Sequence, residues 1–198
     1  MPKIVDKAAV RAQILDAALQ IYADGGVHAA SLEKVAAAAG IGKGTLYYYF
    51  TSKEALALAI AERHFERLEA ELTEVTKASS PQELVDALAA FSKRSDQEYN
   101  NLRVLIDIFS PGFGSGRALA RARAFAETAG AALAQVLANM RTNGSLDACF
   151  EPAVLARLLV GILDGLTLHD ALMETRPEER ERKNAVLVQL LKAGFSSG

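Results

Sequence analysis

The 198-residue sequence contains little of the chemistry that marks disulfide-rich, metal-binding or β-rich proteins. Its one cysteine, Cys149, allows neither an internal disulfide nor a cysteine-based zinc site, so we expect a reduced thiol. Its three histidines, at positions 28, 64 and 169, do not stand at the spacing of a metal-binding pair. Proline is scarce, alanine is abundant, and the 51% of hydrophobic residues show no strand-like alternation. This pattern predicts an all-α fold.

Catalytic and cofactor motifs are equally sparse. His169 and Asp170 are neighbours on a predicted helix, where adjacent side chains diverge by about 100°, so they do not form a catalytic dyad. The spaced glycines of residues 110–116 are not preceded by a strand, which a phosphate-binding glycine loop requires. The sequence therefore predicts no enzyme, no catalytic residue, no metal and no cofactor.

Targeting and membrane segments are not recognised either. The first residues, MPKIVDKAAVRAQ, are charged and contain no apolar core of the kind found in signal peptides. The longest apolar run, Ala153 to Leu168, is interrupted by Arg157 and Asp164 and is shorter than a bilayer-spanning helix. We expect a soluble cytoplasmic protein that does not use a membrane.

The charge of the chain is unevenly distributed. Residues 1–53 carry a formal charge of +2 and residues 54–198 carry −4, although the whole chain is only −2. No acidic residue lies between Glu33 and Glu54, whereas Lys34, Lys43 and Lys53 fall in or beside that interval. Lys3 and Lys7 precede it as a basic lead-in, which would lie along a phosphate backbone or, equally, extend into solvent. The short basic end is the one expected to meet nucleic acid.

Residues 31–50, SLEKVAAAAGIGKGTLYYYF, predict two short helices joined by a glycine turn. Ser31 is a suitable N-cap for the first helix, and Gly40 stands where a helix ends in the left-handed conformation. Leu46 and Phe50 are four residues apart and share the inner face of the second helix. Lys43, Thr45, Tyr48 and Tyr49 then point outward, with Tyr47 at the boundary. Such a face offers a cation, hydroxyls and flat rings to phosphates and base edges in the major groove of DNA.

The run GIGKGTLYYYFTSKEAL, with Ser31 to Ala36 before it and Ile14 to Ala18 on the preceding helix, resembles the DNA-binding domain of the tetracycline-repressor (TetR) family. The resemblance is specific over about residues 8–60 and only architectural beyond them. Gly42 departs from the family pattern, which more often has a polar residue there, and Glu33 stands where some relatives carry a basic side chain. By position, the resemblance implies DNA contacts from Ser31, Lys43, Gly44, Thr45, Tyr47, Tyr48, Tyr49 and Lys53.

The sequence predicts about nine helices in two domains. Residues 1–53 form a three-helix helix-turn-helix DNA-binding domain, and residues 54–198 form a larger helical effector-binding and dimerisation domain. A long helix over residues 52–76 joins the two and is the expected transmitter of a ligand signal. The helix that begins at Pro152 is apolar on more than one face, so we expect it to pack against a second copy of the chain. The resemblance implies a homodimer through the last two helices and an inverted-repeat DNA operator.

The predicted function is a ligand-responsive transcriptional regulator, a repressor that a small-molecule effector of unknown identity releases from double-stranded DNA. The alternative is an all-helical small-molecule-binding or enzymatic protein whose helix-turn-helix is only structural. A constitutive DNA binder without an effector also stays open. Candidate effector contacts are apolar and polar side chains of the middle helices, any of which is equally at home in an ordinary core or surface: Phe65, Leu68, Phe91, Tyr99, Arg103, Asp107, Phe109, Phe113 and His169.

Overall fold

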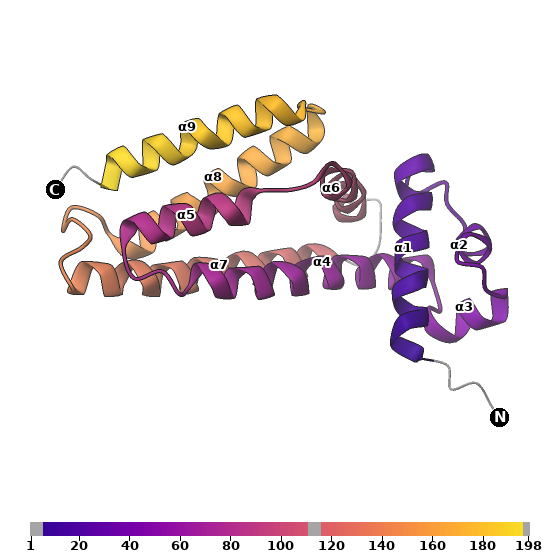
Figure 1. Ribbon diagram of the computed structural model, residues 1–198. Helices are drawn as coiled ribbons and strands as arrows, with labels where there is room; N and C mark the ends of the chain where they lie inside the picture. The colour runs from indigo at the N-terminus through magenta and orange to yellow at the C-terminus, as the bar shows by residue number, and fades with distance from the viewer. Residues whose placement is uncertain (1–5, 111–115, 196–198) are drawn as a thin grey trace. The chain divides into compact units, whose positions relative to one another are not determined.

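The computed structural model describes residues 6–110 and 116–195, so the candidate Phe113 lies outside the described residues. Within these ranges the chain forms nine helices and no strand, which confirms the all-α prediction (Figure 1). The helices are α1 (Lys7–Gly25), α2 (Leu32–Ala38), α3 (Lys43–Tyr49), α4 (Lys53–Val75), α5 (Pro81–Ser92), α6 (Asp96–Phe109), α7 (Arg117–Thr142), α8 (Pro152–Leu172) and α9 (Pro177–Phe195).

The helices belong to two compact units. The first comprises residues 1–64 and 100–122, and the second comprises residues 65–99 and 123–198. Three helices, α4, α6 and α7, run from one unit into the other. These units are defined by packing alone. The predicted boundary at residue 53, between the DNA-binding domain and the effector-binding domain, stays a prediction.

The first unit is organised by local signals at the ends of its short helices. The Asp6 carboxylate caps α1 by accepting hydrogen bonds from the backbone N–H of Ala8 and Ala9. The Ser31 hydroxyl caps α2 by accepting from the Lys34 N–H at 3.3 Å. Gly40 ends α2 with a φ of +63°, as the glycine turn predicted. Ile14, Leu46 and other apolar side chains of α1 to α4 then close a common core.

Replacing Gly40 by alanine is expected to lower the free energy of unfolding by about 1 kcal/mol, because a side chain at positive φ is strained. Urea denaturation of the purified protein measures this change. Gly25, the last residue of α1, is the matched control because an added Cβ meets no atom within 4 Å and its φ is not in the positive range. Equal destabilisation by Gly25→Ala and Gly40→Ala would contradict the assignment of strain to the turn.

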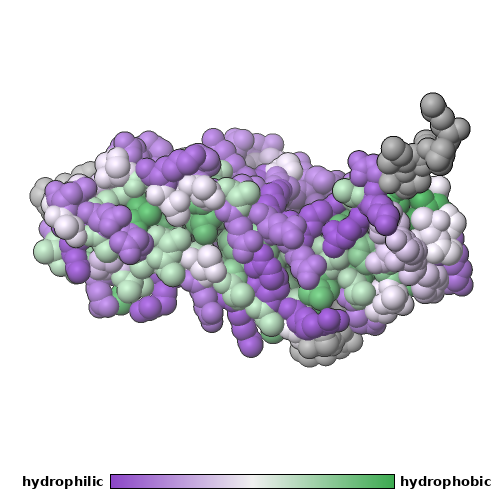
Figure 2. All heavy atoms as spheres, turned by 90° about the horizontal axis from the view of Figure 1, so that it is seen from below, coloured by the Kyte–Doolittle hydropathy of each residue, from purple (hydrophilic) through white to green (hydrophobic). Residues whose placement is uncertain are grey.

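The second unit places α5 beside α9, which pack against each other (Figure 1). The Ser80 hydroxyl caps α5 by accepting from the Glu83 N–H at 3.3 Å, and the Glu83 carboxylate accepts in return from the Ser79 N–H at 2.8 Å. The rings of Phe65 and Phe125 pack with their centroids 5.4 Å apart. Over the face drawn in Figure 2, hydrophilic residues are interspersed with hydrophobic ones, as expected for the solvent-facing sides of amphipathic helices.

α8 differs from the sequence-based expectation. Its 21 residues are long and apolar enough, by length and composition alone, to cross a bilayer, so the expectation that this run is too short is wrong. The helix includes both Arg157 and Asp164 and extends past Leu168 to Leu172. The core helix of a soluble protein meets the same criteria of length and apolar composition. Only 22% of the most apolar 18-residue window of α8 is buried. Most residues of this window are therefore partly or fully exposed on the single chain.

Candidate nucleic-acid interface

The short helix α3 presents one side to the core and the other to solvent. Leu46 is fully buried, while Lys43, Thr45 and Tyr48 are exposed, Tyr48 by 69%. Tyr47 is 39% exposed, whereas Tyr49 is half-buried against the core of the first unit. The expectation that Tyr49 points outward is therefore wrong, whereas Tyr47 lies near the boundary as expected. The ring of Tyr49 instead meets the ring of Tyr48 edge to face, at 5.3 Å between centroids.

Lys43 is held in place by an ion pair across the helix-turn-helix. Its Nζ lies 2.6 Å from the Glu33 Oε1 and 5.7 Å from the ring centre of Tyr47. The hydrogen bond to Glu33 raises the pKa of the Lys43 ammonium, and the same bond lowers the pKa of the Glu33 carboxyl. Both side chains are more than half exposed, so the pair adds little to stability. Its consequence is positional, since it holds the Lys43 ammonium, which stays exposed to solvent, on the outer face of α3.

Lys7 joins this surface from the start of α1. Its Nζ donates a hydrogen bond to the Tyr48 hydroxyl at 3.2 Å and lies 5.6 Å from the centre of the same ring. This hydrogen bond raises the pKa of Lys7. The sequence identified Lys7 only as part of a basic lead-in, because its contact with a residue 41 positions away leaves no local pattern.

Two further candidates have roles within the chain. The Lys53 ammonium donates to the carbonyl oxygens of His28 at 2.8 Å and Ala30 at 3.3 Å, which ties the start of α4 to the turn before α2. Ser31 supplies the helix cap described above. Their predicted DNA contacts stay predictions, with the added expectation that Lys53 also stabilises the first unit.

Gly44 has no steric reason to be a glycine within the chain. It lies in the first turn of α3, its φ is not in the positive range, and an added Cβ meets no atom within 4 Å. Glycine in a helix costs stability of about 0.5–1 kcal/mol relative to alanine. A glycine retained on an exposed helical face at that cost is consistent with close approach by another molecule.

Gly44→Leu is expected to leave the free energy of unfolding equal or higher, while it weakens DNA binding by about tenfold or more, because a branched side chain would separate α3 from the duplex. Urea denaturation and fluorescence anisotropy measure the two effects on the same preparation. Gly42→Leu provides the control. Gly42 precedes α3 as its N-cap, and an added Cβ there would come within 4.0 Å only of the Thr45 hydroxyl. Unchanged DNA affinity in Gly44→Leu would exclude a close approach at this position.

The candidate effector residues are divided between the two units. Arg103, Asp107 and Phe109 lie in the first unit, with Asp107 exposed. In the second unit, His169 is exposed on α8, and Phe91 is half-buried beneath the Arg94 guanidinium, whose carbon lies 5.0 Å from the ring centre. The buried members of the second unit are Phe65, Leu68 and Tyr99.

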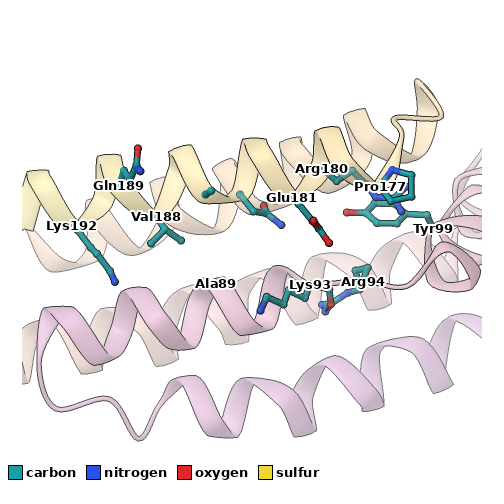
Figure 3. A pocket seen from close by; sticks show the side chains of 12 residues that line it. Ala89, Lys93, Arg94, Tyr99, Pro177, Arg180, Glu181, Val188, Gln189 and Lys192 are labelled. Atoms are coloured by element: carbon teal, nitrogen blue, oxygen red, sulfur yellow. Dashed lines mark hydrogen bonds between the residues drawn. The ribbon is translucent and has the colours of Figure 1, made fainter.

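One groove in the second unit is large enough for a small organic molecule. It measures about 720 Å³ and lies between α5, the start of α6 and α9 (Figure 3). Among the effector candidates in the described residues, only Tyr99 lines it. The basic residues of this groove come from segments almost a hundred positions apart, so no local pattern in the sequence predicts that they lie together. Its lining residues are Ala89, Lys93, Arg94, Tyr99, Pro177, Arg180, Glu181, Asn184, Ala185, Val188, Gln189 and Lys192.

Comparison with known proteins identifies the first unit. Residues 14–60, which run from α1 to the first turns of α4, match the family of bacterial regulatory proteins of the tetR type. The chain is 32% identical to the transcriptional activator FasR of Mycolicibacterium smegmatis over 99 residues, which are 49% of this chain and 45% of FasR. It is 26% identical to the regulator UidR of Escherichia coli K12 over 157 residues, 79% of each chain.

The fold of the whole chain agrees with that match. The structure of SmeT in its complex with triclosan superposes with a TM-score of 0.76 at 22% identity, covering 94% of this chain and 91% of SmeT. The match with FasR spans about half of each chain, so it carries no information on the rest. Residues 14–60 thus match the tetR family of bacterial regulatory proteins, and the chain is similar to a bacterial transcriptional regulator over 79% of its length and to SmeT in fold.

Proposed function

We propose that the protein is a homodimeric repressor that binds an inverted-repeat operator and is released by a small molecule. In this proposal residues 1–53 read DNA, and residues 54–198 bind the effector and form the dimer. This function places the protein in the bacterial cytoplasm. The observation that carries the proposal is the exposed face of α3, where Lys43, Thr45 and two tyrosines stand clear of the core that Leu46 anchors.

The exposed face of α3 suits the major groove in both charge and shape. Lys43 supplies a cation for a phosphate, and Thr45 and Tyr48 supply hydroxyls for phosphates or base edges. The interval between Glu33 and Glu54 contains no carboxylate, so the helix itself does not repel DNA. Gly44 leaves room for a close approach. Lys7 adds a second cation beside Tyr48.

A regular apolar stripe on α8 supports the homodimer. Its positions follow one another at alternating spacings of four and three residues, which places them on one side of the helix. The four large side chains are about half exposed, between 47% and 56%, and the two central glycines would let a second helix approach closely. Val186 and Leu190 add exposed apolar surface on α9. The stripe consists of Val154, Leu158, Gly161, Gly165, Leu168 and Leu172.

The proposed signal path is α4. It is one uninterrupted helix from Lys53 to Val75, and it belongs to the first unit up to His64 and to the second from Phe65. A ligand that favours a different position of its far end would change the spacing of the two DNA-reading heads. Operator affinity would then fall by the difference in ligand affinity between the two states, typically about 1–3 kcal/mol. The triclosan complex of SmeT is an example of the same fold holding a small molecule.

Hydroxyl-radical footprinting on the DNA beside the protein's own gene tests the proposal. We expect protection of an inverted repeat whose half-site centres lie one helical turn, about 10–10.5 base pairs, or a multiple of it apart. Protection of one unrepeated segment would contradict the dimeric reading. Uniform protection of all sequences would contradict sequence reading itself.

A further inference from the structure

The groove between α5 and α9 combines an apolar floor with a basic wall. Ala89 and Val188 face the groove from opposite helices, and Val188 points toward α5 (Figure 3). Four of its lining side chains are cations and one, Glu181, is a carboxylate. All of these residues belong to the second compact unit. This composition differs from that of an ordinary seam between helices, which is apolar at its centre.

Arg94 differs from the other cations of the groove because its charged side chain is almost fully buried. Its side chain is only 8% exposed, and burial lowers the pKa of its guanidinium. It donates to the Lys93 carbonyl oxygen at 2.9 Å. Its Nη2 lies 3.3 Å from the Glu71 Oε2, but that oxygen receives no hydrogen bond from the described residues. A guanidinium carries five N–H donors in a planar fork, and this geometry suits the oxygens of a carboxylate, sulfonate or phosphate group.

At the same end of the groove as Arg94, Arg180 and Tyr99 form a rigid flat wall (Figure 3). The Arg180 guanidinium lies over the Tyr99 ring, with its carbon 4.1 Å from the ring centre. Arg180 also donates to the Thr175 carbonyl oxygen at 2.7 Å and forms an ion pair with Asp96. These contacts fix the stacked pair in one orientation, which suits the packing of a planar or apolar ligand body against it.

We propose that the groove binds an amphipathic organic anion. Its apolar body would lie on Ala89, Val188 and the Tyr99 ring, and its carboxylate, sulfonate or phosphate group would meet Lys93 and Arg94. Lys93 is exposed at the end of α5 and supplies a solvent-accessible cation beside the buried one. A neutral ligand of the same shape would gain the apolar contacts but leave the guanidinium donors unmatched.

The same geometry links the groove to α4. Glu71 lies on α4, and it is the carboxylate paired with Arg94 and, at 3.6 Å, with Arg67. An anion bound at Arg94 competes with Glu71 for the guanidinium, and it therefore loosens the α5–α6 connection from α4. This step rests on the proposed function, because it takes α4 as the carrier of the signal to the DNA-binding domain.

Fluorescence titration with 8-anilinonaphthalene-1-sulfonate tests the site on the full-length protein without DNA. N-phenyl-1-naphthylamine is the matched neutral probe, because it has the same aromatic body without the sulfonate. We expect saturable binding of one sulfonate probe per chain, weakened about tenfold by Lys93→Glu. The neutral probe should be unaffected by that substitution. Lys77→Glu is the control, since Lys77 lies outside the groove in an exposed pair with Glu74.

Two results would overturn the site. The first is equal affinity for the charged and neutral probes, and the second is equal behaviour of Lys93→Glu and Lys77→Glu. A mobility-shift assay with operator DNA then tests the link to α4, with the sulfonate probe expected to release DNA from the wild type but not from Lys93→Glu. Probe binding in the groove without DNA release would overturn the link and leave the site. Failure of the probe-free protein to bind any operator would overturn the proposed function instead.

Discussion

The double substitution Leu158→Glu and Leu168→Glu is expected to convert the protein from a dimer to a monomer and to weaken operator binding by about 10²–10⁴-fold. Both leucines lie on the exposed stripe of α8, where they are 56% and 47% exposed. In a symmetric dimer each glutamate would be buried beside the stripe of the partner chain, and two buried carboxylates without cations are strongly unfavourable. A monomer would then bind a single half-site, and it would lose the additional affinity that arises when two recognition helices are linked in one dimer.

Sedimentation velocity at micromolar concentration and anisotropy with operator DNA measure the two effects. Leu119→Glu is the control, because Leu119 is also an exposed leucine, at 37%, but lies on α7. Since both positions on α8 are exposed within one chain, the double variant should keep the circular dichroism of a folded helical protein. A wild-type monomer, or a double variant that still sediments as a dimer, would contradict the assignment of the stripe.

Lys43→Glu is expected to weaken operator binding by more than about a hundredfold, because it reverses one phosphate-facing charge in each of two heads. It also leaves two carboxylates, at positions 33 and 43, where the ion pair now stands. The milder Lys43→Ala should lower the salt dependence of binding by about one phosphate per head. Anisotropy titrations at several salt concentrations measure both quantities.

Exchanging the charges separates the two roles of Lys43. The double variant Glu33→Lys and Lys43→Glu restores an ion pair across the same 2.6 Å contact. Its stability should approach that of the wild type, less about 0.5 kcal/mol for a cation in the first turn of α2. DNA affinity should stay low, because the cation has moved from α3 to α2. Recovery of DNA affinity in the exchanged variant would mean that Lys43 acts only by pairing with Glu33.

The parts of the fold that the sequence predicted well depend on neighbouring residues. The cap at Ser31 and the turn at Gly40 each depend on residues within four positions of the contact they make. Such signals survive in a single sequence since they do not depend on tertiary packing.

The features that the sequence did not predict depend on contacts between distant residues. The burial of Tyr49 is decided by how α3 sits on the core, which the run of three tyrosines does not reveal. The ion pair of Glu33 with Lys43 joins two helices across a turn. The basic groove joins Arg94 to residues near Arg180, which no local pattern connects. His169 lies on an exposed side of α8. Because α8 is apolar on several sides, the sequence of this helix does not show which side packs against the rest of the chain.

An anisotropy titration at fixed salt tests the central claim most directly. The full-length protein is titrated into a labelled duplex from the promoter region beside its own gene, and into a scrambled duplex of equal length and composition. We expect the protein to bind the promoter duplex at least about 10³-fold more tightly than the scrambled duplex. Equal, weak binding to both, at this promoter and across the footprinted region, would contradict a sequence-reading repressor and favour a small-molecule-binding protein whose helix-turn-helix is structural.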